Sequence, residues 1–120
     1  MRAPFQILAI PYKLGPILQY CILHRSDIDQ YQFVAGGGED DEKPIEAAAR
    51  EIYEETFVKA ANIMSLTSMA YIPANVISQK HRDLWPHDTI VIPEYTFQLS
   101  TLMIAFQSAI VPIKVIFSNL

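Results

Sequence analysis

Apolar residues occur in short runs along the chain, and polar or glycine-containing segments separate these runs. Residues 5–12 and 17–24 are rich in β-branched and aromatic side chains, with a turn-forming segment at residues 13–16 between them. This pattern predicts two antiparallel strands joined by a turn. Strand-like composition returns in three later runs, at residues 31–35, 64–72 and 95–106.

Residues 44–56 follow a helical period instead. Pro44 suits the first helical position, where the missing N–H is not needed, and no residue up to Thr56 breaks the pattern. With 120 residues, the chain is expected to form one α/β domain. The helix is predicted to pack on a sheet through one apolar stripe, which consists of Ile45, Ala48, Ala49, Ile52 and Tyr53.

The charge is concentrated in one part of the chain. The formal net charge is −4, and residues 39–55 contain eight acidic and two basic residues. Glu51, Glu54 and Glu55 lie at helical spacing away from the apolar stripe, where three like charges repel one another. Such a face is commonly a solvated surface, but a divalent cation would turn the repulsion into attraction. Ligands that are all oxygens favour Mg²⁺ or Mn²⁺ over Zn²⁺.

The spacing of these acids follows a recognisable signature. A glycine is followed after six positions by a glutamate, and eight positions later by an arginine-glutamate-aliphatic-x-glutamate-glutamate run. This pattern resembles the Nudix box. The resemblance implies a mixed β-sheet between helices and Mg²⁺-dependent hydrolysis, with Mn²⁺ as the alternative ion, in which water attacks phosphorus of a phosphoanhydride. The residues that carry the pattern are Gly36, Glu42, Arg50, Glu51, Glu54 and Glu55.

The resemblance also implies roles for individual residues. Glu42 is expected to pair with Arg50, which would hold Glu51 in place. Glu94, the only glutamate after the box, is a catalytic candidate for accepting the proton, although an exposed acid at a strand entrance explains it equally well. The implied metal ligands are the carbonyl of Ala35 and the carboxylates of Glu51, Glu54 and Glu55.

One position departs from the box. Phe57 stands where the family usually has a glycine that leaves the helix in a left-handed conformation. A bulky residue at positive φ costs about 1–2 kcal/mol. The helix is therefore predicted to continue through Lys59 and to end near Asn62.

The signals for substrate recognition are weaker. Residues 2–8 look most like the start of dihydroneopterin triphosphate and deoxynucleoside triphosphate pyrophosphohydrolases, which implies a phosphorylated small molecule as substrate. Residues 73–93 are irregular and read as a functional loop. The substrate-binding candidates are the backbone at Gly36 and Gly37, the side chains of Arg25 and Arg82, and Trp85 or Tyr95 as a stacking platform, with ordinary surface or core roles as the alternative for each side chain.

Residues 98–120 do not resemble the family, because they are apolar and contain Lys114 as their one charged residue. Three interpretations stay open: closing strands that are buried, a truncated or frame-shifted end that leaves the domain incomplete, and a membrane anchor. Polar interruptions argue against the anchor, so no membrane partner is expected. The apolar tail and the resemblance together suggest a homodimer.

The remaining features bound the cellular context. Cys21 is the single cysteine and is expected to be a small buried residue. One thiol and no signal peptide predict a cytoplasmic protein. No basic patch points to nucleic acid. A Nudix-fold module that binds a nucleotide or protein partner without hydrolysis is the alternative function, but retention of every box glutamate favours the enzyme.

Overall fold

A computed structural model describes residues 1–25, 27–57, 59–60, 62–100 and 113–118. The chain forms strands and helices in an α/β arrangement, and its elements are named in chain order. They are β1 (Arg2–Leu14), β2 (Leu18–Arg25), β3 (Gln30–Gln32), β4 (Val34–Glu39), α1 (Pro44–Thr56), β5 (Met64–Pro73), the 3₁₀ turn η1 (Ala74–Val76), the single-turn helix α2 (Gln79–Arg82), β6 (Val91–Ser100) and β7 (Ile113–Ser118).

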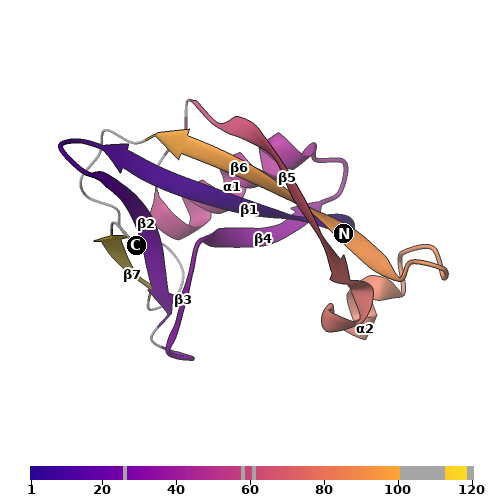
Figure 1. Ribbon diagram of the computed structural model, residues 1–120. Coiled ribbons are helices and arrows are strands. Elements are labelled where there is room, and N and C mark those ends of the chain that lie inside the picture. Colours follow the sequence, from indigo (N-terminus) through magenta and orange to yellow (C-terminus); the bar gives the residue numbers. More distant parts are fainter. Residues whose placement is uncertain (26, 58, 61, 101–112, 119–120) are drawn as a thin grey trace.

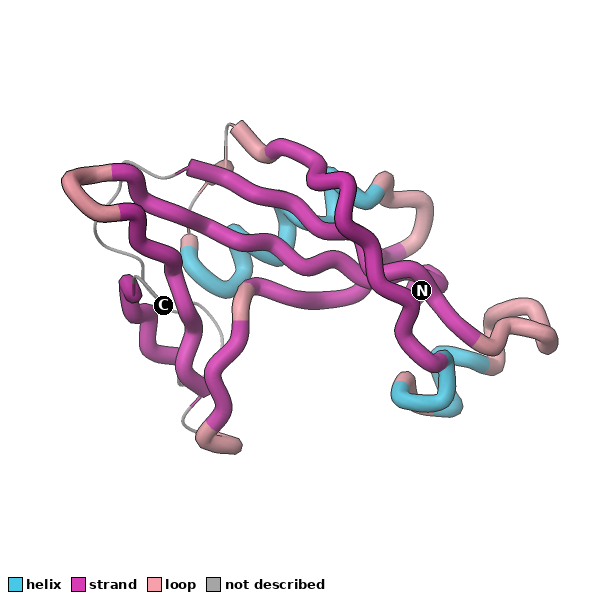
Figure 2. Tube along the Cα trace, viewed as in Figure 1, coloured by secondary structure: helices cyan, strands magenta, loops and turns pink. Residues whose placement is uncertain are grey.

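The strands form one mixed sheet, as predicted. The main path runs β3-β2-β1-β6-β5, with β4 paired to β1 and β7 paired to β2. The β1 and β6 strands are parallel, and the other pairs are antiparallel. Because β6 occupies one edge of β1, β4 and β2 share the other edge at successive positions. The sheet therefore divides into two arms, and α1 lies across one of its faces (Figures 1 and 2).

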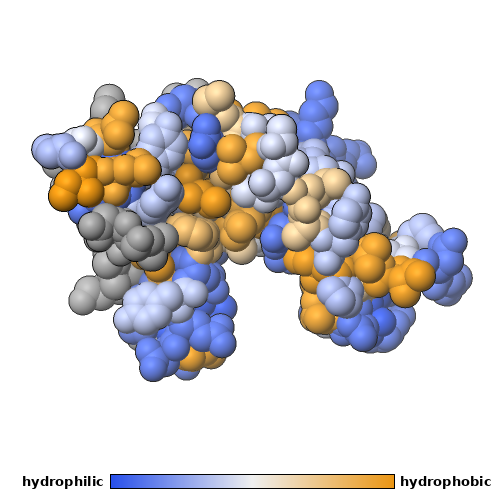
Figure 3. Space-filling view, in the orientation of Figure 1, coloured by the Kyte–Doolittle hydropathy of each residue, from blue (hydrophilic) through white to orange (hydrophobic). Residues whose placement is uncertain are grey.

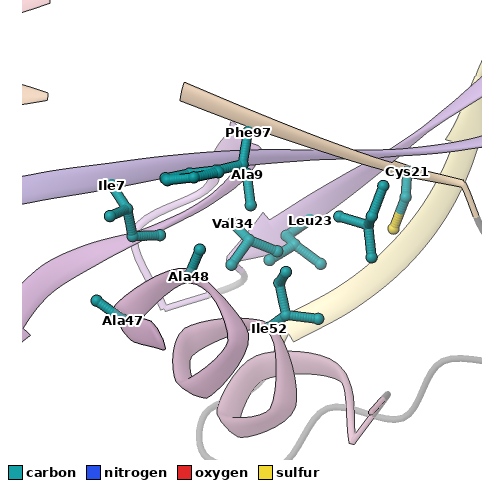
Figure 4. Close-up of a cluster of buried hydrophobic side chains, with 10 residues drawn as sticks. Ile7, Ala9, Cys21, Leu23, Val34, Ala47, Ala48, Ile52 and Phe97 are labelled. Atoms are coloured by element: carbon teal, nitrogen blue, oxygen red, sulfur yellow. The ribbon is translucent and has the colours of Figure 1, made fainter. Parts of the chain in front are cut away.

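The main core lies between α1 and the sheet (Figure 4). Ile7, Val34 and Phe97 reach down from the strands to meet Ala48 and Ile52 of the helix. The helix is rotated relative to the predicted stripe, because Ala47 and Thr56 are also buried whereas Ile45 and Tyr53 are 44% and 45% exposed. The small alanines let the helix approach the strands closely, so the larger Ile45 and Tyr53 are left at the margins. Cys21 is buried in this core, as predicted.

The helix ends at Thr56, so the predicted extension to Asn62 is wrong. Phe57 adopts the left-handed conformation, with φ 61° and ψ 11°, and its N–H donates to Tyr53 O at 2.8 Å. Its ring packs edge-on against the Tyr53 ring, with centroids 6.0 Å apart. The side chain that was expected to prevent this exit therefore gains a contact from it.

We expect Phe57→Gly to give a higher free energy of unfolding than Phe57→Ala, by about 1 kcal/mol. Both substitutions remove the ring contact with Tyr53, so the comparison isolates the conformational cost of a β-carbon at positive φ. Urea unfolding of the two variants measures the difference. Equal stability of the two variants would contradict the left-handed exit.

Two segments differ from the sequence predictions. The run at residues 31–35 is interrupted at Phe33, and the glycines that follow lie inside β4, where Gly36 and Gly37 pair with Ile7 and Gln6, rather than in a loop. Residues 73–93 contain η1 and α2 and are anchored by Trp85, which is 4% exposed in a second apolar cluster with Ala74 and Ile92. Trp85 is thus a core residue, not a stacking platform.

The strand predicted at residues 95–106 is present as part of β6 up to Ser100, and its predicted residues 101–106 lie outside the described part of the chain. Within the atypical tail, Ile113–Ser118 form β7 against β2. The interpretations of the tail at residues 101–112 and 119–120 likewise fall outside the described part of the chain. Among the described residues, no helix combines the length and apolar character needed to cross a bilayer.

Exposed apolar side chains gather along β5 and around α2 (Figure 3). The homodimer nevertheless stays a prediction, because nothing in the structure identifies what covers this surface. The exposed apolar residues here are Met64, Met69, Tyr71, Val76, Leu84, Ile90 and Val91.

Candidate active site

The start of α1 fixes the register of its acidic residues. Pro44 occupies the first turn, and the Lys43 N–H donates to Glu46 Oε1 at 2.8 Å, which satisfies a backbone donor at the helix entrance. The helix then runs unbroken to Thr56. Arg50 and the three predicted ligands are consequently carried by one rigid element.

Arg50 joins the helix, the acidic loop and β4. Its guanidinium holds Glu42 through two bonds, Nε to Oε2 at 2.8 Å and Nη2 to Oε1 at 3.0 Å, so the predicted pairing of these residues is present. Nη2 also donates to Gly37 O at 2.8 Å. Nη1 donates to Glu51 at 2.9 Å and to Glu54 at 3.2 Å. The hydrogen bonds with Glu42 raise the pKa of Arg50 and lower that of Glu42.

Glu51 lies in the angle between α1 and β4. Its side chain is 14% exposed and rests against Gly36 so closely that a β-carbon at Gly36 would overlap the carboxylate. This is the physical requirement for glycine at that position. Burial raises the pKa of Glu51, and the Arg50 guanidinium opposes the rise.

Glu55 is the least satisfied of the three acids. Its Oε2 is buried and has no hydrogen-bond partner among the described residues. Burial, with the Glu51 charge next, raises the pKa of Glu55 to about 8, although Arg25 partly offsets this. An unpartnered buried carboxylate oxygen is costly unless a proton or a cation satisfies it.

This donor set fits a hard divalent cation. Glu51, Glu54 and Glu55 supply only oxygen atoms, and the orphaned oxygen of Glu55 would gain a partner. Within the described residues, no three acidic, histidine or cysteine side chains already converge closely enough to enclose an ion. The reason is visible in the contacts, since Arg50 holds Glu51 and Glu54 toward itself.

A pocket of about 380 Å³ opens beside Glu51. It brings together the ends of β1 and β4, the helix α1 and the α2 segment. Arg2 and His81 are far from the box in sequence, and only the fold brings them beside it, whereas Glu39 lies within the box but has no assigned position in its pattern. The pocket is lined by Met1, Arg2, Gly37, Glu39, Glu51, His81 and Leu84.

Three other predicted site residues do not line this pocket. Arg25 pairs with Asp27 at 2.6 Å. Arg82 donates from Nε to Ile77 O at 2.8 Å and lines a separate pocket of about 100 Å³. Ala35 lies in β4 opposite Leu8, directly before Gly36.

Glu94 lies in β6 and faces away from the main core. Its Oε2 accepts from Gln6 Nε2 at 3.0 Å. Its neighbour Tyr95 packs toward the α1 side, and strand alternation therefore points Glu94 to the opposite face. Glu94 does not line the pocket beside Glu51.

In the protein without metal, Glu55→Gln is expected to raise the free energy of unfolding at pH 8.5 by about 2 kcal/mol and to have little effect near pH 4.5. The folded-state pKa of Glu55, about 8, lies above its ordinary value of 4.5. The wild type therefore loses stability between these values as pH rises, because the unfolded chain ionises first. Glutamine has no charge to desolvate.

Urea unfolding in a chelator at both pH values measures this effect. Glu46→Gln is the matched control, because Glu46 is an exposed acid of the same helix and glutamine preserves its capping bond. Parallel stability profiles for wild type and Glu55→Gln would contradict the burial of the charge.

The sequence and fold of the chain are similar to those of known proteins. The NUDIX domain profile matches residues 18–100. A Listeria monocytogenes protein assigned as a NUDIX hydrolase is 33% identical, with 97% of this chain and 77% of that chain covered and a TM-score of 0.73. None of the curated proteins matches the chain.

Two more distant structures share the fold. The Escherichia coli dihydroneopterin triphosphate pyrophosphohydrolase is 21% identical, with 98% and 82% of the two chains covered and a TM-score of 0.69. The NUDIX domain of Shewanella oneidensis NrtR, solved with ADP ribose, is 15% identical, with 98% and 74% covered and a TM-score of 0.68.

Proposed function

This chain belongs to the Nudix hydrolase family, a family of phosphoanhydride-cleaving enzymes that generally use divalent metal, and we propose that it is a Mg²⁺-dependent pyrophosphohydrolase. Water would attack phosphorus of a nucleoside triphosphate or a dihydroneopterin-triphosphate-like substrate. The observation that carries this proposal is the helix α1, on which Arg50 braces two acids while the third, Glu55, keeps a buried oxygen without a partner.

Glu51, Glu54 and Glu55, with the carbonyl of Ala35, are the residues that would hold Mg²⁺ or Mn²⁺. When bound, such an ion neutralises charge on phosphate oxygens and lowers the pKa of a water molecule. Arg50 holds Glu51 and Glu54 on the same side of α1 through its Nη1, and their carboxylates would turn from Arg50 toward the ion on binding. Glu42 anchors Arg50 from the acidic loop.

The proton acceptor is proposed to be one of the box glutamates, with Glu94 as the candidate outside the box. The contact of Glu94 with Gln6, on the face away from the core, makes it the weaker candidate. Glu94→Gln separates these options, since a base role for Glu94 would lower kcat roughly 100-fold or more.

Substrate class is proposed from the pocket and the comparisons together. Gly37 borders the pocket beside Glu51, and the absence of a side chain there leaves room for the Arg2 guanidinium on the pocket wall. Arg25 already pairs with Asp27, and Arg82 bonds to a carbonyl away from the pocket, so both are weaker phosphate-binding candidates than the sequence suggests. A cytoplasmic location and a homodimer remain predictions.

Turnover of a substrate panel tests the proposal. The panel contains dihydroneopterin triphosphate, dATP, ADP ribose and diadenosine polyphosphates, each with Mg²⁺ and with a chelator. We expect turnover with Mg²⁺ only, and identification of pyrophosphate or phosphate as product locates the scissile bond. A folded sample without turnover of any member would favour the alternative of a binding module.

A further inference from the structure

Arg2 is a half-buried cation on the wall of the pocket beside Glu51. Its Nη1 donates to the carbonyls of Phe5 and Ala3, and its Nη2 lies 3.4 Å from Gln6 Oε1. All three acceptors are uncharged. No carboxylate of the described residues forms an ion pair with Arg2, whereas Arg50 and Arg25 each have acidic partners. The positive charge of Arg2 is therefore not neutralised by a paired carboxylate, and it can attract an anionic ligand.

The position of Arg2 is built from several sides. Its backbone lies opposite Glu39 in β4, and Trp85 Nε1 donates to Arg2 O at 2.7 Å. The guanidinium lies directly over Gly37, where any β-carbon would overlap it. The missing side chain of Gly37 therefore makes room for Arg2, as the missing side chain of Gly36 makes room for Glu51. Burial lowers the pKa of Arg2, and the nearby Glu51 charge opposes this.

The α2 segment completes the pocket. Trp85 is held in its own apolar cluster, and the same segment brings His81 and Leu84 to the pocket wall. The pocket thus has Glu51 in one wall, a guanidinium without a carboxylate partner among the described residues in another, and a third wall that is partly apolar. A phosphate chain needs this combination, because one part must meet the metal-binding acids and another needs cationic donors.

We propose that Arg2 binds a phosphate group of the substrate in this pocket, beside the acids of the Nudix box, and thereby selects substrates with a pyrophosphate moiety. Nη1 is engaged by the carbonyls of Phe5 and Ala3, so the Nε–Nη2 edge of the planar guanidinium would supply the paired N–H donors for two non-bridging oxygens of one phosphate. This inference rests on the proposed function. It adds a substrate-binding residue from the start of β1, well before the box in sequence.

A purely structural role is the competing explanation, since Arg2 also ties together the first residues of β1. The two roles predict different measurements. A structural role predicts lower thermal stability with unchanged affinity of the folded fraction. A phosphate-binding role predicts weaker affinity and higher KM, with a smaller change in kcat.

The test measures binding of methylenediphosphonate, whose P–C–P bridge water does not cleave, by calorimetry in the presence of Mg²⁺. The wild type, Arg2→Met, Arg2→Lys and the control Lys59→Met are compared. Lys59 is an exposed cation with no assigned role, so its substitution matches the loss of charge. We expect Arg2→Met to weaken binding roughly 10- to 100-fold, Arg2→Lys to weaken it less because one donor group remains, and Lys59→Met to have no effect.

The inference is overturned if the wild type does not bind methylenediphosphonate, or if both Arg2 variants bind it as the wild type does. If Arg2→Met does not fold, Arg2→Lys decides, with at least a threefold loss of affinity at an unchanged melting temperature as the supporting result.

The same variants are assayed for turnover. Arg2-dependent binding without any turnover by the wild type supports phosphate binding by Arg2 and refutes the proposed hydrolysis. Normal turnover and normal binding by Arg2→Met refute only the role of Arg2.

Discussion

Glu54→Gln is expected to lower kcat/KM for the best substrate by roughly a thousandfold, because metal assistance contributes several kcal/mol to such reactions. Glutamine keeps the size of the side chain and an acceptor for Arg50, so the fold is retained. It removes one negative charge from three carboxylates that lie close on one helix. Stability without metal should therefore stay unchanged or rise, while stabilisation by added Mg²⁺ should decrease.

Steady-state kinetics and thermal unfolding, each with Mg²⁺ and with a chelator, measure these two effects. Glu46→Gln is again the control, because it changes an acid of the same helix that is distant from the box contacts. Full activity in Glu54→Gln would exclude Glu54 as a ligand. Loss of activity in Glu46→Gln would show instead that the helix tolerates no charge change.

Arg50→Ala is expected to cost about 3 kcal/mol of unfolding free energy and most of the activity. The side chains of Arg50, Glu42 and Glu51 are 22%, 21% and 14% exposed. Removal of the Arg50 guanidinium leaves both partly buried carboxylates without their cationic partner. The carbonyl of Gly37 also loses its donor. The repulsion among the carboxylates of Glu51, Glu54 and Glu55 on α1 would then no longer be offset by the Arg50 charge.

Arg50→Lys separates charge from geometry. Lysine keeps the positive charge but not the fork that holds Glu42 through two nitrogens, so an intermediate loss of stability is expected. Urea unfolding and turnover of folded protein give the two readouts. Wild-type stability in Arg50→Ala would contradict the bracing role, and so would full activity in its folded fraction.

The box and its helix could be predicted because they depend on residues that lie close together in the sequence. Pro44 and the spacing of Glu51, Glu54 and Glu55 determine one helix face without information from distant residues. The Arg50–Glu42 pair followed from the same signature. The prediction fails at Phe57, where the backbone keeps the left-handed exit usual for the family's glycine and the ring packs against Tyr53.

The other departures also come from contacts between distant segments. Ile45 and Tyr53 are apolar at helical spacing, but the sheet buries Ala47 and Thr56 instead, because small residues fit against it. The sequence predicts Trp85 as a stacking residue in an irregular loop, but Trp85 is buried and anchors that loop. Arg2 carries no local signal, because it reaches the box only through β1–β4 pairing and the bond from Trp85.

The most direct test of the central claim is a Mn²⁺ titration followed by electron paramagnetic resonance on folded wild type and Glu55→Gln. The claim is that the acids of α1 form a site for a divalent cation. It predicts saturable binding by the wild type and at least tenfold weaker binding by Glu55→Gln, because the buried oxygen that lacks a partner is lost as a ligand. Absence of saturable binding by the wild type, or equal affinity in both proteins, would contradict it.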